Sequence, residues 1–172
     1  MTEIQFLTRE EARERLDELS EVLHDCVHGG ASVSFMLPFP LEEARDFWRD
    51  VAESVGRGET LLVAALHEGR VVGTVLVGLK QTPNQPHRGD LKKLLVHREA
   101  RGFGLSRLLM EAAERKAVEA GKTLLVLDTA TGSPAEDIYP RFGWQRVGVV
   151  PDYALYPDGS YCGTTFFYKR IA

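Results

Sequence analysis

The hydrophobic period of the chain changes between Gly56 and Thr60. Before this point, residues 9–27 and 41–55 repeat apolar side chains every three to four positions, which is the spacing of amphipathic helices. After it, residues 60–80 contain two strand-length apolar runs joined by the turn sequence HEGR, which is typical of an antiparallel hairpin. A chain with this order has to pack helices against a sheet.

The second half adds a strand, a long helix and another strand. Residues 90–97 form a strand-length run, and residues 105–120 have the helical period and end at Gly121. The unbroken apolar run TLLVLD at residues 123–128 is typical of a buried parallel strand. Together these segments predict a βαβ unit.

The C-terminal segment predicts a short helix followed by a hairpin. Ser133, Pro134 and Glu136 have the pattern of a helix start with a capping box. Residues 144–154 and 161–171 are strand-length and are joined by the turn sequence YPDG. With no repeat, linker or composition shift, residues 1–172 are expected to form one domain of mixed α/β class.

Composition and charge limit the cellular location and the kind of ligand that we expect for this chain. The N-terminus is charged where a secretion signal needs an apolar run, and no apolar run approaches the roughly 20 residues that cross a membrane. The two cysteines, Cys26 and Cys162, are isolated, so we expect a cytoplasmic protein without a metal site. Residues 92–107 carry a net charge of +4, which leaves −8 elsewhere. A local patch of this kind suits a small polyanion and not nucleic acid.

Two glycines lie inside the basic segment, between the predicted strand and the predicted helix. Gly102 and Gly104 allow several N–H groups to converge at the positive end of the helix dipole, with Arg101 and Arg107 beside them. The third glycine of a dinucleotide-binding fingerprint is replaced by Arg107, and no P-loop lysine follows. The loop therefore either binds another phosphate group or is only a tight turn.

Two motifs in order along the chain resemble those of the GCN5-related N-acetyltransferase (GNAT) family. They are LLVHREARGFGLSRLL at residues 94–109 and AEDIYPRFGWQRVG at residues 135–148. The resemblance implies a GNAT-like acyl-CoA N-acyltransferase fold across nearly the whole chain, with a central, mostly antiparallel mixed sheet of about six to seven strands flanked by about four helices.

The resemblance also implies acetyl-CoA as cosubstrate. In the family, a strand pairs with the pantetheine as if with another strand, and the glycine loop grips the pyrophosphate. The residues that match these roles here are Leu94, Leu95, Val96, Arg101, Gly102, Phe103, Gly104, Leu105, Ser106 and Arg107.

The implied reaction transfers the acetyl group to a primary amine of a small molecule by direct attack in a ternary complex. An amine with a pKa near 10.4 needs about 4.6 kcal/mol to reach its free base at pH 7, so a carboxylate is useful. Asp128 and Asp90 follow or open the predicted parallel strands and are expected either to accept the proton, to hold the ammonium group, or only to cap the strand ends.

Tyr139 matches the family's tyrosine near the coenzyme sulfur and is expected to donate a hydrogen bond to the departing thiolate. Its apolar neighbours in the helical period are equally consistent with a core tyrosine. Pro140 directly after it removes a backbone donor and is expected to distort the short helix.

The sequence says less about which residues bind the amine acceptor. Residues 27–36, 127–139 and 146–159 are similar to the tabtoxin resistance branch of the family, whose members acetylate a small amine-bearing toxin. This similarity predicts that two segments face the substrate, the loop and the aromatic hairpin. Their residues are His28, Gly29, Gly30, Tyr153 and Tyr156.

Two alternative functions and the possibility of a homodimer stay open at this point. The chain is alternatively a coenzyme-binding sensor without catalysis, or a protein-lysine acetyltransferase. The aromatic tail at residues 164–171 is either core or a surface through which two copies form a homodimer.

Overall fold

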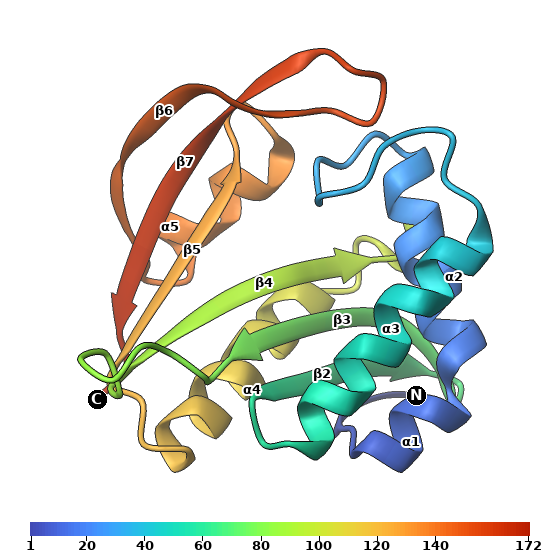
Figure 1. Ribbon diagram of the computed structural model, residues 1–172, viewed down its shortest axis with the longest axis horizontal. Helices are drawn as coiled ribbons and strands as arrows, with labels where there is room; N and C mark the ends of the chain where they lie inside the picture. Colours follow the sequence, from blue (N-terminus) through green and yellow to red (C-terminus); the bar gives the residue numbers. More distant parts are fainter.

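A seven-stranded sheet runs through the computed structural model, which describes residues 1–172 (Figure 1). The strand order is β1-β2-β3-β4-β5-β7-β6, and every neighbouring pair is antiparallel except β4 with β5. The predicted mixed, mostly antiparallel sheet is thus confirmed. The strands are β1 (Thr2–Phe6), β2 (Thr60–His67), β3 (Arg70–Gly78), β4 (Arg88–Val96), β5 (Leu124–Ala130), β6 (Gln145–Leu155) and β7 (Tyr161–Arg170).

Helices cover both faces of the sheet, so the protein has two hydrophobic cores. Along β2, Leu62 and Leu66 pack against α2 and α3, whereas Val63 and Ala65 between them pack against α4. This alternation follows from the period of two in a strand, and it explains why β2 is apolar at nearly every position. The helices are α1 (Arg9–Glu14), α2 (Leu16–His28), α3 (Leu41–Gly56), α4 (Leu105–Glu119) and α5 (Ile138–Arg141), with 3-10 turns at Arg98–Ala100 and Pro134–Asp137.

The N-terminal segment differs from the prediction in two ways. Thr2–Phe6 forms strand β1, paired with β2, although its sequence predicts no strand. The single helix expected at residues 9–27 is divided at Arg15, whose φ of −99° and ψ of 18° are not helical. Strand pairing along an existing edge therefore outweighs a weak local pattern.

The predicted capping box at Ser133 is wrong. The Ser133 side chain makes no capping hydrogen bond, and its buried Oγ has no partner within the chain. Glu136 turns instead toward β6 and β7, where it accepts a hydrogen bond from Thr165 Oγ1 at 2.9 Å and lies 3.3 Å from Arg146. The other carboxylate oxygen of Glu136 accepts a hydrogen bond from the amide of Gly132, one residue before Ser133, so the capping-box bond to the Ser133 amide does not form.

The edge of the sheet at β6 is exposed. Val147, Val149 and Val150 are among the most exposed large apolar side chains of the protein. An edge of this kind can pair with another chain. The homodimer through the terminal strands stays a prediction.

Strands β4 and β5 pair over a short distance only. Residues 88–90 of β4 face residues 124–126 of β5, and beyond this point the two strands diverge, as Figure 1 shows. Strand β4 continues beside β3, and β5 continues beside β7. The divergence opens a wedge in the middle of the sheet.

A bulge in β4 lies where the wedge opens. Thr74 of β3 faces Leu95, while Leu76 faces Lys92, so β4 has one residue more than β3 across this stretch. Lys93 has a φ of 54°, and its carbonyl oxygen accepts a hydrogen bond from Thr74 Oγ1 at 3.1 Å. The bulge therefore changes the direction of the side chains that β4 presents to the wedge.

Gly89 makes the short parallel pairing testable. A Cβ atom at this position would lie 2.9 Å from Leu125 Cδ2 and 3.1 Å from Val77 Cγ1, inside a core that is already filled. We expect Gly89→Ala to lower the free energy of unfolding by about 1–3 kcal/mol, measured by urea denaturation. Gly148→Ala is the control, because its Cβ meets no atom within 4 Å. Equal stability of the two variants would contradict the account.

Candidate active site

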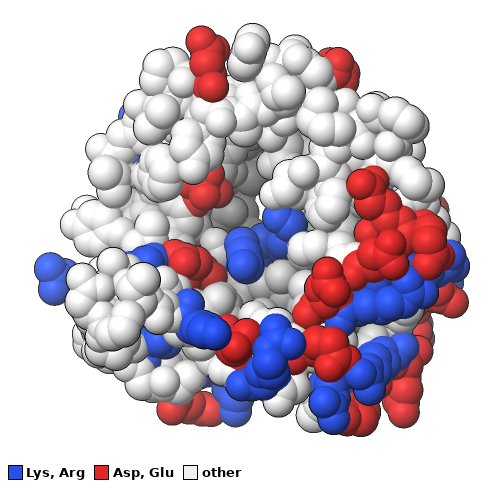
Figure 2. Space-filling view, in the orientation of Figure 1, with Lys and Arg blue, Asp and Glu red and all other residues white.

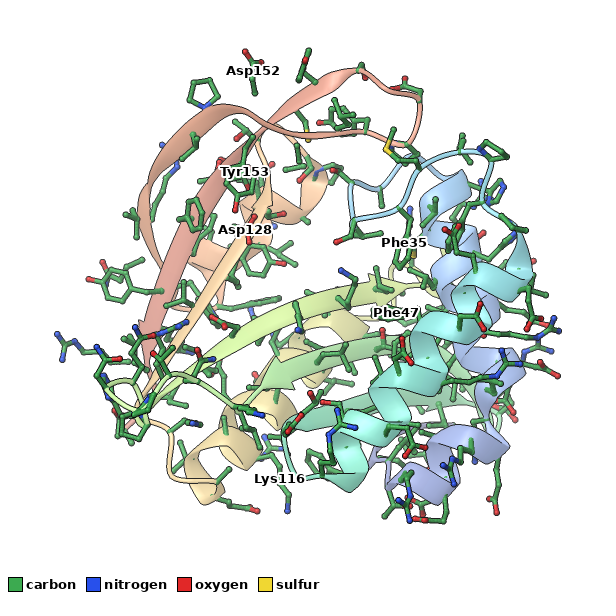
Figure 3. All side chains as sticks on the ribbon, viewed as in Figure 1. Phe35, Phe47, Lys116, Asp128, Asp152 and Tyr153 are labelled. Atoms are coloured by element: carbon green, nitrogen blue, oxygen red, sulfur yellow. The ribbon has the colours of Figure 1, made fainter.

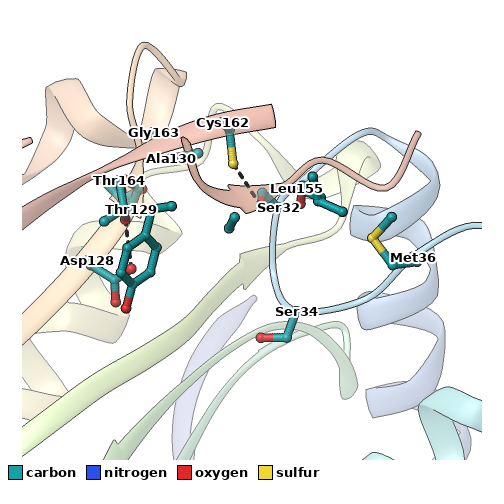
Figure 4. Close-up of a pocket in the computed structure, with 12 residues that line it drawn as sticks. Ser32, Ser34, Met36, Asp128, Thr129, Ala130, Leu155, Cys162, Gly163 and Thr164 are labelled. Atoms are coloured by element: carbon teal, nitrogen blue, oxygen red, sulfur yellow. Dashed lines mark hydrogen bonds between the residues drawn. The ribbon is translucent and has the colours of Figure 1, made fainter. Parts of the chain in front are cut away.

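A pocket of about 340 Å³ lies at the open end of the wedge (Figure 4). Its walls come from the loop between α2 and α3, from the end of β5, and from the hairpin of β6 and β7. Figure 2 shows the face of the molecule hollowed in its middle, with acidic and basic residues beside the hollow. The lining residues are Ser32, Ser34, Met36, Asp128, Thr129, Ala130, Tyr153, Ala154, Leu155, Cys162, Gly163 and Thr164.

The loop between α2 and α3 crosses to the C-terminal hairpin. Ser32 Oγ donates to the carbonyl oxygen of Leu155 at 2.9 Å, and the amide of Leu37 donates to that of Pro157 at 3.0 Å. Cys162 Sγ lies 3.4 Å from Ser32 Oγ. These contacts tie the first and last parts of the chain together over the wedge.

The loop residues that line the pocket are not those expected from the sequence. His28 packs against His24 with the rings tilted and their centroids 4.0 Å apart, and Gly29 and Gly30 end α2. None of the three lines the pocket; Ser32, Ser34 and Met36, a few residues later, do. These residues lie in a loop that is neither helix nor strand, and its position against the distant hairpin is not readable from the local sequence.

Of the two hairpin tyrosines expected to face the substrate, one lines the pocket and the other does not. Tyr153 lines the pocket and packs edge-on against Phe166, with ring centroids 5.8 Å apart. Tyr156 does not line the pocket.

The two aspartates considered for the reaction have different surroundings. Asp128 lines the pocket, its Oδ2 accepts a hydrogen bond from Thr164 Oγ1 at 2.7 Å, and it forms no ion pair (Figure 4). Asp90 forms an ion pair with Arg88 and accepts a hydrogen bond from Gln81 Nε2 at 2.9 Å. Asp128 is therefore the carboxylate that remains free to meet a cation in the pocket.

Tyr139 lies in α5, close to the same end of β5. Its ring is buried beside Phe167 and Trp144, at centroid distances of 5.5 and 6.2 Å. Burial, and secondly the charge of Asp128, raise the pKa of the phenol well above its ordinary value. The hydroxyl therefore stays protonated and is a hydrogen-bond donor over the whole neutral range.

Pro140 does not disrupt this arrangement. It lies in the first turn of α5, where N–H groups have no intrahelical acceptor, so its missing donor is not needed there. The turn closes after it through a hydrogen bond from the amide of Trp144 to the carbonyl oxygen of Tyr139 at 3.0 Å.

The basic glycine loop has the conformation that an anion site requires. Gly102 and Gly104 have φ values of 88° and 73°, and Gly104 precedes α4 without any side-chain cap. The N–H groups of the first turn, at residues 105–107, have no intrahelical acceptor and lie at the positive end of the helix dipole. Arg101 is exposed beside them, and its Nε donates to the carbonyl oxygen of Val96 at 3.2 Å.

The other members of the loop have structural contacts as well. The guanidinium of Arg107 lies over the ring of Phe142, 4.6 Å from its centroid, and Phe103 stacks on His67 at 5.9 Å. Arg98 pairs with Asp25 at 2.8 Å, so it is not free for a ligand. Arg98 and Arg107 thus have partners within the protein, and Arg101 is the arginine of the loop that is left for a ligand.

The strand that precedes this loop has a free side. Beyond Asp90, β4 pairs with β3 alone, and Leu94, Leu95 and Val96 follow the bulge. Leu95 packs into one core, while Leu94 and Val96 pack against the other. Their side chains therefore hold the strand in place while its other edge faces the wedge.

Lys93 is the main site residue that the sequence did not single out. Its Nζ donates to Ser34 Oγ at 3.1 Å and lies 5.7 Å from the centroid of Phe47. Burial, and secondly the charge of Lys92, lower the pKa of Lys93 to about 8, while Asp128 acts in the opposite sense. Two consecutive lysines in an otherwise apolar strand were the available signal, because adjacent residues of a strand point to opposite faces.

The two sides of the wedge carry opposite charges. Figure 3 shows Asp128 and Tyr153 on one side and Phe35 and Phe47, the rings beside Lys93, on the other. No group of three His, Cys, Asp or Glu side chains comes together as metal ligands would.

The half-buried charge of Lys93 has a measurable effect on stability. The unfolded chain binds a proton at Lys93 up to its ordinary pKa of 10.5, whereas the native protein releases it near 8, so native stability rises with pH between these values. At pH 7 we expect Lys93→Met to be more stable than the unmodified protein by on the order of 1–3 kcal/mol, and the difference to shrink toward pH 10. Lys80→Met is the exposed control, and a difference that does not change with pH would contradict this account.

Known structures share the fold of this chain. The fold is similar to an N-acetyltransferase from Staphylococcus aureus Mu50 (TM-score 0.82, 17% identity, 100% of this chain and 99% of that chain covered). It is also similar to yncA, a putative acetyltransferase from Salmonella typhimurium with its cofactor acetyl-CoA (0.79, 16%, 100% and 95%), and to an aminoglycoside 6'-acetyltransferase type Ii (0.72, 20%, 99% and 97%).

None of the helices is both long enough and apolar enough to cross a membrane. Residues 19–144, well over half of the chain, match the family described as the Acetyltransferase (GNAT) family, with the glycine loop and Tyr139 inside the matched range. The chain with this divided sheet and uncapped helix α4 belongs to the GNAT acetyltransferase family.

Proposed function

We propose that this protein transfers the acetyl group of acetyl-CoA to a primary amine of a small molecule by direct attack in a ternary complex. The observation that carries the proposal is the divergence of β4 and β5, around which we group three features. These are the free edge of β4, the uncapped start of α4 that follows this strand, and Asp128 at the end of β5, whose charge acts on the buried phenol of Tyr139. A thioester held between the first two would have its carbonyl carbon close to the third.

The coenzyme is assigned to β4 and the glycine loop. The first-turn N–H groups of α4 and the guanidinium of Arg101 suit a pyrophosphate, because both favour negative charge. The backbone of Leu94–Val96 can hydrogen-bond the amide groups of the pantetheine in the manner of an added strand. The thioester would then lie at the bulge, where β4 and β5 have separated.

On the acceptor side, Asp128 is preferred to Asp90. Asp128 lines the pocket without an ion pair, so it can hold the ammonium group and provide the route by which the proton leaves. Asp90 is already engaged by Arg88 and Gln81. In the reaction, the amine nitrogen bonds to the acetyl carbon, the bond from this carbon to sulfur breaks, and the amine loses its proton.

Tyr139 would stabilise the leaving group. A buried phenol with a raised pKa is a weak acid, so its contribution is a hydrogen bond to the developing thiolate and not full proton transfer. A hydrogen bond to a charged group contributes about 1.5–3 kcal/mol.

A small acceptor is favoured over a protein. The hydrogen bonds from Ser32 to Leu155 and from Leu37 to Pro157 cross the open end of the wedge, where a polypeptide would have to pass. We further propose a toxin or antibiotic with a free amine as the acceptor, from the sequence resemblance of residues 27–36, 127–139 and 146–159 to the tabtoxin resistance branch. The free cysteines Cys26 and Cys162 suit a reducing compartment such as the cytoplasm.

The test measures thiol release from acetyl-CoA with a panel of small amines, amino acids and antibiotics. We expect release only in the presence of an acceptor, and a kcat for Tyr139→Phe that is roughly 10- to 100-fold lower, because the thiolate loses its donor. Stabilisation of Tyr139→Phe by acetyl-CoA in thermal melts should match that of the unmodified protein. Tyr156→Phe, outside the pocket, is the control.

The other outcomes identify the alternatives. Stabilisation by acetyl-CoA without release for any acceptor would indicate a coenzyme-binding sensor. Release with lysine peptides but not with small amines would indicate a protein acetyltransferase. No stabilisation by acetyl-CoA would overturn the coenzyme site itself.

A further inference from the structure

A second depression adjoins the candidate active site and has a different charge. It measures about 480 Å³ and lies between α3 and the bulged part of β4. Ser34 lines both this depression and the pocket that contains Asp128, so the two are neighbours. The charged residues that line it are Lys92, Lys93 and Asp50.

The bulge brings two consecutive lysines to one depression. In a regular strand, Lys92 and Lys93 would point to opposite faces of the sheet. Here both line the same depression, because the extra residue and the left-handed backbone at Lys93 redirect its side chain. The distortion is held by the hydrogen bond from Thr74 Oγ1 to the carbonyl oxygen of Lys93.

Lys93 has no anionic partner in the protein. Its Nζ donates only to the neutral Ser34 hydroxyl. It lies 6.0 and 5.7 Å from the ring centroids of Phe35 and Phe47, near the upper limit for a cation–π contact. An ammonium group with a single neutral acceptor retains two free donors. A half-buried cation in this state favours an anionic ligand over water.

Across the opening, Asp128 is the only charged residue among those that line the first pocket. Ser34, which accepts the hydrogen bond from Lys93 Nζ, lines both the depression of Lys93 and the pocket of Asp128, and the two charged groups form no ion pair. Lys93 and Asp128 therefore border neighbouring spaces that one ligand can span.

We propose that the acceptor carries an acidic group as well as its amine, and that Lys93 binds the acidic group while Asp128 holds the amine. The inference rests on the proposed function and names the class of its acceptor, an amine that bears a carboxylate, phosphonate or phosphate. Lys93 is then a specificity-determining residue. Polycationic amines, which present no anion to Lys93 and Lys92, are poor acceptors.

The test compares ω-amino carboxylates of increasing chain length with their primary amides, which keep the amine but lose the charge. The protein should acetylate the carboxylates with a kcat/KM roughly 10- to 100-fold higher at the best length, mainly through KM. Lys93→Met should abolish this preference and Lys93→Arg should retain part of it. Comparing the same acceptors in each variant cancels the difference between their amine pKa values.

Lys116→Met is the matched control, because this lysine lies on α4 outside both depressions (Figure 3). An unmodified protein that accepts amides as well as carboxylates would overturn the inference and leave the proposed function intact. A preference that persists in Lys93→Met would also overturn it.

Calorimetry with the coenzyme A complex separates the two proposals, because it requires no turnover. Binding of an ω-amino carboxylate that depends on Lys93, without any thiol release, would support the assignment of Lys93 to an acidic ligand and contradict the proposed acetyl transfer. Absence of binding by carboxylates and amides alike would overturn the inference.

Discussion

The short parallel pairing of β4 with β5 is the constraint on which the rest of the structure depends. Only residues 88–90 and 124–126 pair, with Gly89 allowing the close approach. Each strand then follows its antiparallel neighbour, β3 or β7, and the right-handed twist of a sheet carries the two halves apart. The core around α4 fixes the angle between the two halves, since it contains residues of β2 to β5 and of β7. The wedge is therefore a stable feature of a well-packed protein.

The wedge concentrates groups whose proton affinities are shifted in different directions. Burial raises the pKa of Tyr139 and lowers that of Lys93, so each favours its neutral form. The charge of Asp128 raises the pKa of both. A half-buried ammonium without a carboxylate partner reduces stability, and such groups are typical of sites that a ligand completes. The arrangement links the geometry of the sheet to the choice of acceptor.

Much of the fold could be predicted from the sequence where a strong period and a clear boundary coincide. The helix ending at Glu119, the hairpin of β2 and β3, and the strand at Leu124–Ala130 all have such patterns. Strand β1 and the break at Arg15 could not be predicted, because tertiary pairing decides them and the local sequence is neutral. The capping box at Ser133 failed since Glu136 has competing partners on β6 and β7.

The candidate site could be predicted only in part, for a related reason. The glycine loop is contiguous in sequence, and its left-handed glycines were readable from residue type alone. Lys93 depends on a bulge set by the register of β3 against β4, and Ser32 and Ser34 depend on a loop that reaches the far hairpin. Such long-range placement has no signal in a single sequence.

The most direct test of the account is hydrogen exchange of the backbone amides with and without coenzyme A. If the free edge of β4 and the start of α4 hold the coenzyme, exchange should slow at residues 94–96 and 102–107, while the paired amides of β1 stay unchanged. Protection confined to other elements, or none under conditions where the coenzyme is bound, would contradict the claim that the diverging strands form the binding site.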